Sequence, residues 1–359
     1  MTNYDEIYLN LLRDVMDNGK KKHTRAGDVV SVFGRQMHID IKDSVALLTT
    51  KKVYVRGVIV ELLWFLQHSS NINGSMNIKY LVENKTHIWD MDAYRWFREW
   101  ISANMPDDIT GKVRYYQVIG EGDSNSPTAY RMCRKFIDFT KSDFLSMTKD
   151  EFIENVLEQN EICVMRANGN NARYRFGDLG PIYGTQWRSF GETKTDQIQN
   201  IIDTLKTNPT DRRMLCVAYN PDVLSRVALP PCHVMMQFYT RELPGTDKLG
   251  LSCMYTNRSQ DCFLGKPFND LGYSVLTYMI AKLVDMVPDE LVASVGDCHI
   301  YLNHMDAVTE QLERKGSDKK PKLIIHGNQK SIDDFKIEDF EIVDYEPDPV
   351  IKAPLSVGL

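Results

Sequence analysis

The stretch from Leu229 to Asn269 constrains this chain more than any other part of its sequence. It reads LPPCHVMMQFYTRELPGTDKLGLSCMYTNRSQDCFLGKPFN, in which a cysteine directly follows two prolines and a run typical of strands comes next. That run leads into Arg258, Ser259 and Asp261, and then into a predicted turn over residues 265–269. A thiol, a cation, a carboxylate and an amide so close in sequence indicate an active site.

Length, charge and composition exclude several classes of protein. The chain has 359 residues, 43% hydrophobic and 26% charged, so it can bury a large core as one α/β or α+β domain or as two domains. A net charge of -6 argues against nucleic acid as the main partner, although a small anion held by a few arginines remains compatible. The sequence contains no signal-peptide core and no apolar run long enough to span a membrane. We therefore expect a soluble, cytoplasmic protein without a DNA or membrane partner.

The cysteines predict neither a disulfide framework nor a metal site. They are odd in number and scattered, and no two of them form a CxxC pair. The seven are Cys133, Cys163, Cys216, Cys232, Cys253, Cys262 and Cys298. His299 and His304 have no pair of carboxylates nearby in the sequence, so they too make a poor metal motif. We expect no metal.

Hydrophobic periodicity predicts alternating helices and strands along the chain. Apolar residues from Tyr4 to Val15 recur at helical spacing, and Gly19 ends the pattern. Similar patterns predict helices over 57–65, 93–104, 149–157, 195–207 and 273–287, a polar helix ending near residue 316, and strands over 29–41 and 214–219. Polar stretches at 121–126 and 167–171 interrupt weak patterns, so about 91–170 is predicted to be an insertion at the surface and not core.

Several residues allow both a structural and a functional interpretation. Arg25, beside a glycine, could bind a phosphate or simply occupy a turn. Glu61 lies in an apolar helical run, where a carboxylate is either part of an ion pair or a functional acid or base. Arg212 and Arg213 suit a phosphate dianion, but adjacent arginines are usually solvated. A lone cysteine such as Cys232 is more often an inert buried thiol than a nucleophile.

Taken together, seven segments resemble the thymidylate synthase family over almost the whole chain outside about 91–170. In chain order they are ELLWFLQ, HIWD, GDLGPIYGTQW, DRRMLCVAYNPD, LPPCHVMMQFY, RSQDCFLGKPFN and GDCHIYLNH. The resemblance implies a single domain over residues 1–359, with an α/β (α+β) fold in which a large mixed sheet packs against helices. It also implies a homodimer in which the sheets of the two subunits pack against each other.

The resemblance also implies a reaction. The family transfers a one-carbon unit from 5,10-methylenetetrahydrofolate to C5 of dUMP. A thiolate, here Cys232, adds to C6 so that C5 becomes nucleophilic. Reduction of the resulting intermediate by hydride gives dTMP and dihydrofolate.

Residue by residue, the resemblance assigns three sets of roles. The catalytic residues would be Cys232, Glu61, Tyr183, His233 and Asn269. The nucleotide would be held by Arg25, Arg258 and Ser259 at the phosphate, by Arg212 and Arg213 contributed across the dimer interface, by Asn269 at the uracil edge, and by His299 and Tyr301 at the sugar. The folate would contact Lys51, Trp89, Leu229, Asp261, Gly265 and Phe268.

Some positions depart from the family pattern and leave other reactions open. The loop after Arg25 is shorter than is usual, Thr256 and Asn257 replace a common Tyr-Gln pair, and Asp270 replaces an apolar residue. The C-terminal segment 352–359 is longer than the family's closing tail. An altered seal would let water intercept the intermediate, giving 5-hydroxymethyl-dUMP and tetrahydrofolate. A third alternative is a catalytically inactive homologue that binds nucleotide or RNA.

Overall fold

The computed structural model describes residues 1–67, 75–105, 113–118, 131–136, 140–165 and 170–354, without the side chains of 116–118 and 131–136. The chain forms two compact units. The first comprises 1–67, 186–219 and 231–359, and the second comprises 68–185 and 220–230.

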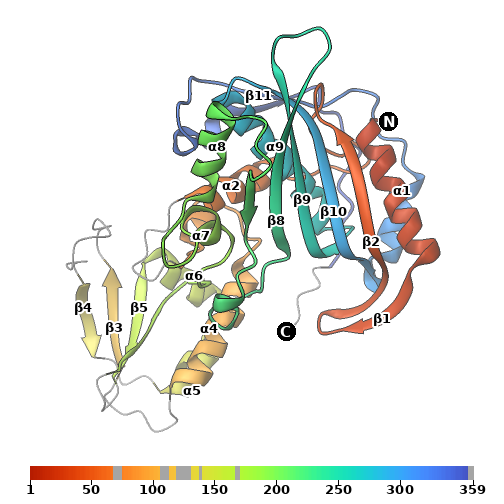
Figure 1. Ribbon diagram of the computed structural model, residues 1–359. Coiled ribbons are helices and arrows are strands. Elements are labelled where there is room, and N and C mark those ends of the chain that lie inside the picture. The colour runs from red at the N-terminus through yellow and green to blue at the C-terminus, as the bar shows by residue number, and fades with distance from the viewer. Residues whose placement is uncertain (68–74, 106–112, 119–130, 137–139, 166–169, 355–359) are drawn as a thin grey trace. The chain divides into compact units, whose positions relative to one another are not determined.

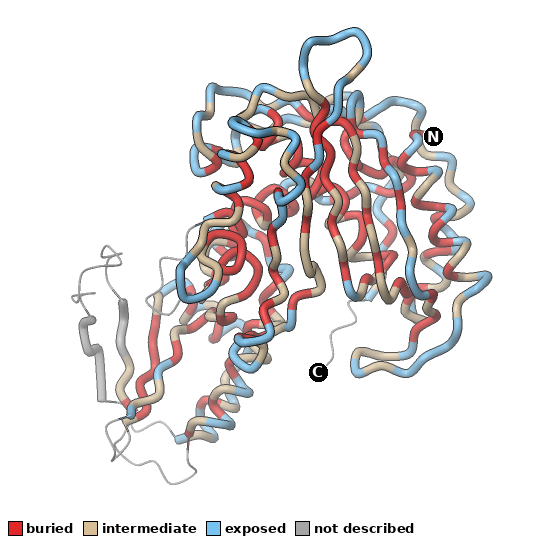
Figure 2. The backbone as a smooth tube through the Cα atoms, viewed as in Figure 1, coloured by how far each residue is buried: buried red, intermediate tan, exposed pale blue. Residues whose placement is uncertain are grey.

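A six-stranded mixed sheet is the centre of the first unit (Figure 1). Its order is β1-β2-β10-β9-β8-β7, and β9 and β10 are parallel while the other neighbours are antiparallel. The strands are β1 (Lys20–Thr24), β2 (Gly27–Asp40), β7 (Leu215–Val217), β8 (His233–Glu242), β9 (Leu249–Asp261) and β10 (Val287–Tyr301). Buried and less buried residues alternate along the central strands, so the sheet has two distinct faces (Figure 2).

Helices α1 (Asn3–Asn18) and α9 (Gly265–Leu283) pack on one face of this sheet. A capping box between Thr2 and Asp5 starts α1, and Gly19 ends it as predicted by donating to the carbonyl of Val15 at 3.0 Å. The other elements of the unit are α2 (Val55–Leu66), α8 (Gln197–Thr207), η2 (Leu302–His304), α10 (Met305–Glu313), β11 (Lys322–Ile325), η3 (Ile332–Asp334), η4 (Ile337–Asp339) and β12 (Phe340–Val343). Within the described ranges, no helix is both long and apolar enough to cross a membrane.

Two predictions for this unit were wrong in their boundaries, and the strands β1, β10, β11 and β12 were missed. Residues 265–269, predicted as a turn, form the first turn of α9, which replaces the helix predicted over 273–287. Pro267 is tolerated there because the first N–H groups of a helix have no partner inside the helix. The strand predicted over 214–219 is limited to β7, and the basic segment before Arg25 forms β1. The helix over 195–207 and the strand over 29–41 are confirmed within two residues by α8 and β2.

The second unit has a core of its own, although most of it was predicted to be a surface insertion. Phe97, Phe144, Phe152 and Phe176 are at most 1% exposed and contact one another. Its elements are α3 (Lys79–Glu83), α4 (Asp90–Asn104), α5 (Lys141–Ser146), α6 (Lys149–Leu157), η1 (Pro221–Arg226) and an antiparallel sheet of β4 (Arg131–Phe136), β3 (Val113–Val118), β5 (Asn160–Val164) and β6 (Ala172–Arg175). Of the polar stretches, 121–126 and 167–169 lie outside the described residues.

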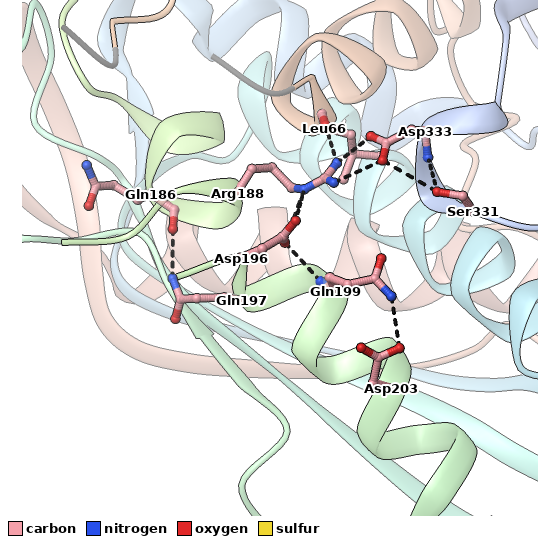
Figure 3. Close-up of polar contacts among 9 residues, drawn as sticks. All are labelled: Leu66, Gln186, Arg188, Asp196, Gln197, Gln199, Asp203, Ser331 and Asp333. Atoms are coloured by element: carbon pink, nitrogen blue, oxygen red, sulfur yellow. Dashed lines mark hydrogen bonds and ion pairs between the residues drawn. The ribbon is translucent and has the colours of Figure 1, made fainter. Parts of the chain in front are cut away.

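Arg188, at the end of α7 (Tyr183–Arg188), ties several elements of the first unit together (Figure 3). Its side chain is 1% exposed, and Nη1 donates to the carbonyl of Leu66 at 2.5 Å and to Asp333 at 2.8 Å. Its Nε donates to Asp196, whose carboxylate also accepts from Gln199 N at the start of α8. One guanidinium therefore joins the end of α2, the cap of α8 and η3.

A buried ion pair, Lys266–Asp270, lies inside α9. Both side chains are 0% exposed, and Lys266 Nζ is 3.1 Å from Asp270 Oδ1. The carboxylate also accepts hydrogen bonds from the hydroxyls of Tyr4, at 2.7 Å, and Tyr255. Asp270 thus links α1, β9 and α9 through one fully satisfied polar cluster.

We predict that Asp270→Leu lowers the free energy of unfolding by about 3–5 kcal/mol, because it leaves Lys266 buried without a counter-charge. The double variant Lys266→Leu/Asp270→Leu should recover most of this loss, since it removes both charges. Urea unfolding of the wild type and both variants measures the difference. A double variant no more stable than the single one would contradict this explanation.

Candidate active site

The beginning of β8 and the end of β9 lie side by side where these strands of the six-stranded sheet end, a place here called the site edge. These strands are antiparallel, and His233 pairs with Asn257. Next to this pair, Arg258 N donates to the carbonyl of Cys232 at 2.9 Å, and Arg258 Nε donates to the carbonyl of Pro231 at 2.8 Å. Arg258 therefore fixes the segment that carries the cysteine.

The end of β10 reaches the same edge because β9 and β10 are parallel. Ser259 pairs with Asp297, and Asp261 pairs with His299. His299 and Tyr301 are both in β10, as their spacing predicted for an extended segment, and their rings contact each other at 5.2 Å. Residues far apart in the sequence are thereby brought together.

Arg25 is exposed in the two-residue turn between β1 and β2, near the same edge. The start of β2 pairs with the end of β10 at Val29 and Tyr301. Burial raises the pKa of Tyr301, the charges of Asp261 and Cys232 raise it further, and Arg25 lowers it. All three groups therefore lie within electrostatic range of the Tyr301 hydroxyl.

Asp297 is a site residue that the sequence interpretation left without a role. It accepts hydrogen bonds from Lys22 and, at 2.9 Å, from Ser31, and its Oδ1 lies 3.1 Å from His299 Nδ1. Burial alone would raise the pKa of Asp297, but Lys22, Ser31 and His299 outweigh it, so the pKa is lowered. This carboxylate orients the His299 ring. The only signal in the sequence is its place two residues before that histidine.

Cys232 differs from the other described cysteines in its exposure. Of the six cysteines whose side chains are described, it alone is not buried. Burial raises the pKa of Cys216, Cys253 and Cys262, in the case of Cys253 to about 12. An accessible thiol beside a guanidinium suits a nucleophile, whereas the buried thiols have the properties of inert core residues.

A small pocket of about 20 Å³ is lined by three of the predicted catalytic side chains. Glu61, His233 and Asn269 line it, together with Val58, Leu62, Phe65, Trp187, Phe268, Gly272 and Tyr273. Burial lowers the pKa of His233 to about 4, although a hydrogen bond to Asn269 opposes this effect. His233 Nδ1 lies 3.1 Å from the Tyr273 hydroxyl. A neutral histidine, a carboxylate and an amide therefore share one largely apolar pocket.

A larger cavity of about 700 Å³ adjoins the start of α9. It is lined by Lys51, Lys52, Val53, Tyr54, Val55, Arg56, Ile59, Leu264, Phe268, Ile337, Phe340, Ile342, Tyr345, Val350 and Ile351. Phe268 lines both this cavity and the smaller pocket. Its apolar walls and three basic residues suit a ligand with an aromatic part and an anionic part.

Lys51 and Asp261 are held at the start of α9 by backbone groups. Lys51 Nζ donates to the carbonyl of Phe263 at 2.6 Å and lies 3.6 Å from the centre of that ring. Burial lowers the pKa of Lys51 to about 7, with Asp261 partly opposing this. Asp261 Oδ1 accepts from the backbone N–H groups of Phe263 and Leu264, at 2.9 and 3.1 Å, just before Gly265 begins the helix.

Three predicted site residues, Trp89, Tyr183 and Leu229, belong to the second unit. The rings of Trp89 and Tyr183 meet edge to face at 5.9 Å, and the two side chains are 7% and 3% exposed. The structure therefore brings two of these residues into contact within their own unit.

Arg212 and Arg213 do not meet Cys232 within one chain. They are exposed, with the Arg213 side chain 92% exposed, and they precede β7, the last strand in the sheet order. The carbonyl of Arg212 accepts from Gln237, five residues along β8 from Cys232. At about 3.3 Å per residue, this is on the order of 15 Å along the strand.

The described residues contain no group of three or more His, Cys, Asp or Glu side chains arranged to hold a metal ion.

The buried His233 predicts a pH dependence of stability. Its pKa of about 4 lies below the value of about 6.5 for an unfolded histidine, so between these values the unfolded chain binds more protons. Stability should therefore fall as the pH drops from 6.5 toward 4, with this residue accounting for about 2 kcal/mol at pH 5. Urea unfolding between pH 7 and 5 should show a shallower loss in His233→Gln. Parallel curves for variant and wild type would contradict the assignment.

Comparison with known proteins gives the family of the chain. The family model described as thymidylate synthase matches residues 6–357. A thymidylate synthase from Mycoplasma mobile is 38% identical over 353 residues, which cover 98% of this chain and 100% of that protein. The chain belongs to the thymidylate synthase family.

Proposed function

We propose that this protein methylates dUMP at C5 to give dTMP, with 5,10-methylenetetrahydrofolate as co-substrate and dihydrofolate as the second product. Family membership supports the reaction. The observation that carries the assignment to this site is the accessible thiol of Cys232, fixed beside Arg258 at the sheet edge where Asp261, His299 and Tyr301 also lie.

Cys232 would act as the nucleophile. Its thiolate adds to C6 of the uracil ring, and the π electron pair of the C5–C6 double bond moves to C5 and O4. C5 can then form a bond to the one-carbon unit, which it is too weakly nucleophilic to do in free dUMP. Loss of the C5 proton and release of the tetrahydrofolate nitrogen from the one-carbon unit leave an exocyclic methylene group at C5. Hydride from the tetrahydrofolate reduces this methylene to a methyl group, the C5–C6 double bond re-forms, and the cysteine leaves as a thiolate.

The phosphate would lie against Arg25, Arg258 and Ser259, with Arg212 and Arg213 supplied by the other subunit. Arginine forks match phosphate oxygens bidentately, so four guanidinium groups can hold a dianion despite the net charge of -6. Two observations support this assignment: the exposed position of Arg25 at the site edge, and the separation of Arg212 from Cys232 within one chain.

Recognition of the nucleoside would fall to Asn269, His299 and Tyr301. An amide can accept from N3–H of uracil and donate to O4, which fits the uracil edge. His299, oriented by Asp297, and the Tyr301 hydroxyl would bind the 3′-hydroxyl of the sugar.

Proton transfers would use the groups around the smaller pocket. Glu61 and the neutral His233 would order water and protons near O4, in an apolar setting that favours uncharged forms. Tyr183 is assigned to removal of the C5 proton by its place in the family motif alone.

The folate supplies the one-carbon unit and the hydride that reduces it. Asp261, Gly265 and Phe268 at the start of α9 would hold its ring system, and Trp89 and Leu229 are assigned to the folate by their places in the family motifs alone. The 700 Å³ cavity has a volume typical of sites for small ligands, and its basic residues, Lys51 among them, would meet the anionic glutamate tail.

A homodimer would pack through the face of the sheet opposite α1 and α9. Strand register places Leu215, Gln237, Met254, Val292 and His38 in one row across that face. On the same strands, Tyr239 is 64% exposed and Phe33 is 83% exposed. Large apolar side chains exposed on a sheet support a second copy as the covering surface.

The mass of the product tests the reaction. Incubation with dUMP and 5,10-methylenetetrahydrofolate should yield dTMP, and Cys232→Ser should reduce turnover by a factor on the order of 1,000 or more, since a serine hydroxyl is a far weaker nucleophile. Mass spectrometry of the nucleotide identifies the product. A product heavier by one oxygen would identify the hydroxymethylase reaction instead, and unchanged turnover in Cys232→Ser would exclude covalent catalysis by that residue.

Mixed dimers test the shared site. Cys232→Ser and Arg212→Ala/Arg213→Ala should each be inactive alone, but after unfolding and refolding together they should recover about a quarter of wild-type activity. This is expected because half of the dimers are mixed and each mixed dimer has one intact site.

The matched control is Cys232→Ser refolded with Asn269→Ala. Both changes lie on the same side of the proposed interface, so every site in the mixed dimer is defective. Equal recovery in both mixtures, or none in the first, would contradict the contribution of the two arginines across the interface.

A further inference from the structure

Next to Asn269, a buried glutamine forms hydrogen bonds with two side-chain amides. Gln260, which is 3% exposed, follows Ser259 near the end of β9. Its Oε1 accepts from Asn269 Nδ2 at 3.0 Å and also from Asn257 Nδ2. Its Nε2 donates to the backbone carbonyl of Asp261 at 3.3 Å.

This chain of hydrogen bonds has a fixed direction. A backbone carbonyl can only accept, so the end of the Gln260 amide that faces Asp261 must be its NH₂ group. The opposite end is therefore the carbonyl oxygen, and each amide that faces it must present a donor. Asn269 must then direct Nδ2 toward Gln260.

The surroundings of Gln260 favour this arrangement. An added Cβ at Gly265 would lie 3.2 Å from Gln260 Nε2, so the glycine leaves room for the NH₂ group. Asn257 is fully buried, and its Oδ1 has no hydrogen-bond partner among the described residues. A buried acceptor without a partner costs about 1–3 kcal/mol. Asn257 thus keeps its Nδ2 donor directed at Gln260, although this leaves its own Oδ1 without a partner among the described residues.

We propose that Gln260 is a positioning residue that makes the site select uracil over cytosine by fixing the direction of the Asn269 amide. This proposal rests on the proposed function, which assigns the base to Asn269. Uracil offers a donor at N3 and an acceptor at O4, whereas cytosine offers an acceptor at N3 and a donor at N4. Rotating an asparagine amide by half a turn would exchange its preference from one base to the other.

Gln260 prevents that rotation because it would bring the Asn269 oxygen against the oxygen of Gln260. With the amide held, cytosine would meet a donor opposite its own donor and an acceptor opposite its own acceptor. A site built to pair polar groups rejects a ligand that leaves them unpaired much more strongly than it rejects one that only lacks a methylene.

The test measures dissociation constants for dUMP and dCMP without folate, so that no chemical step enters. In Gln260→Met, which fills a similar volume without an acceptor, the ratio Kd(dCMP)/Kd(dUMP) should fall by about 10- to 100-fold. A purely structural defect would weaken both nucleotides equally and leave the ratio unchanged. Urea unfolding establishes that the variant is folded, and Gln260→Leu replaces it if it is not.

Two variants serve as controls for polarity and burial. Gln260→Glu should keep the ratio within a few-fold of the wild type, because a carboxyl group still presents an acceptor to Asn269. Gln311→Met replaces another fully buried glutamine, one that donates to Thr50 at 3.0 Å, and should not change the ratio.

Asn269→Asp distinguishes the role of Gln260 from the assignment of the base to Asn269. A protonated aspartate can pair with cytosine, so this variant should shift the preference toward dCMP. If it does and Gln260→Met keeps the wild-type ratio, the role of Gln260 is wrong while the base assignment stands. If Asn269→Asp leaves the ratio unchanged, the base assignment in the proposed function is wrong, and the role of Gln260 fails with it.

Discussion

The parallel pairing of β9 with β10 is the constraint on which the site depends. In an otherwise antiparallel sheet, it brings the carboxyl ends of two strands to one edge, with Asp261 opposite His299. Because β8 is antiparallel to β9, its first residues start at that edge, and Cys232 is bound there to Arg258 through the backbone. A register shift of one residue in β10 would turn every side chain of this strand to the other face and separate these groups.

Buried polar groups then give the site its chemical character. Asp297 is ionised by its hydrogen bonds and orients His299, whereas His233 is kept neutral by burial. Gln260 accepts a hydrogen bond from the Asn269 amide, and the carboxylate of Asp270 balances the charge of Lys266 inside α9. Each of these groups is nearly or fully satisfied, which makes the arrangement rigid and costly to disturb.

Local patterns in the sequence predicted most of the α-helices but few of the strands; α1, α8 and β2 follow helical or alternating periodicity closely. Predictions from local patterns failed where tertiary contacts determine the structure of a segment. The Gly-Lys-Pro-Phe-Asn segment has the composition of a turn, but it begins α9 because the ion pair of Lys266 with Asp270 lies within that helix. The aromatic core of the second unit was missed since Phe97, Phe144 and Phe152 are separated by polar stretches of sequence. The family motifs pointed to Cys232, Asn269 and His299. Asp297 and Gln260 lie within the same motif segments but, like Tyr273, were given no role, because their contacts with site residues depend on the fold.

The central claim is that the Cys232 sulfur bonds to C6 of the nucleotide, and covalent trapping tests it most directly. With 5-fluoro-dUMP and 5,10-methylenetetrahydrofolate, the reaction should stop once both are attached, because the fluorine at C5 cannot leave as a proton would. Intact-protein mass spectrometry should show one nucleotide and one folate added per active site, and peptide mapping should place them on Cys232. No added mass on active wild-type protein, or a stable adduct on another residue, would contradict the account.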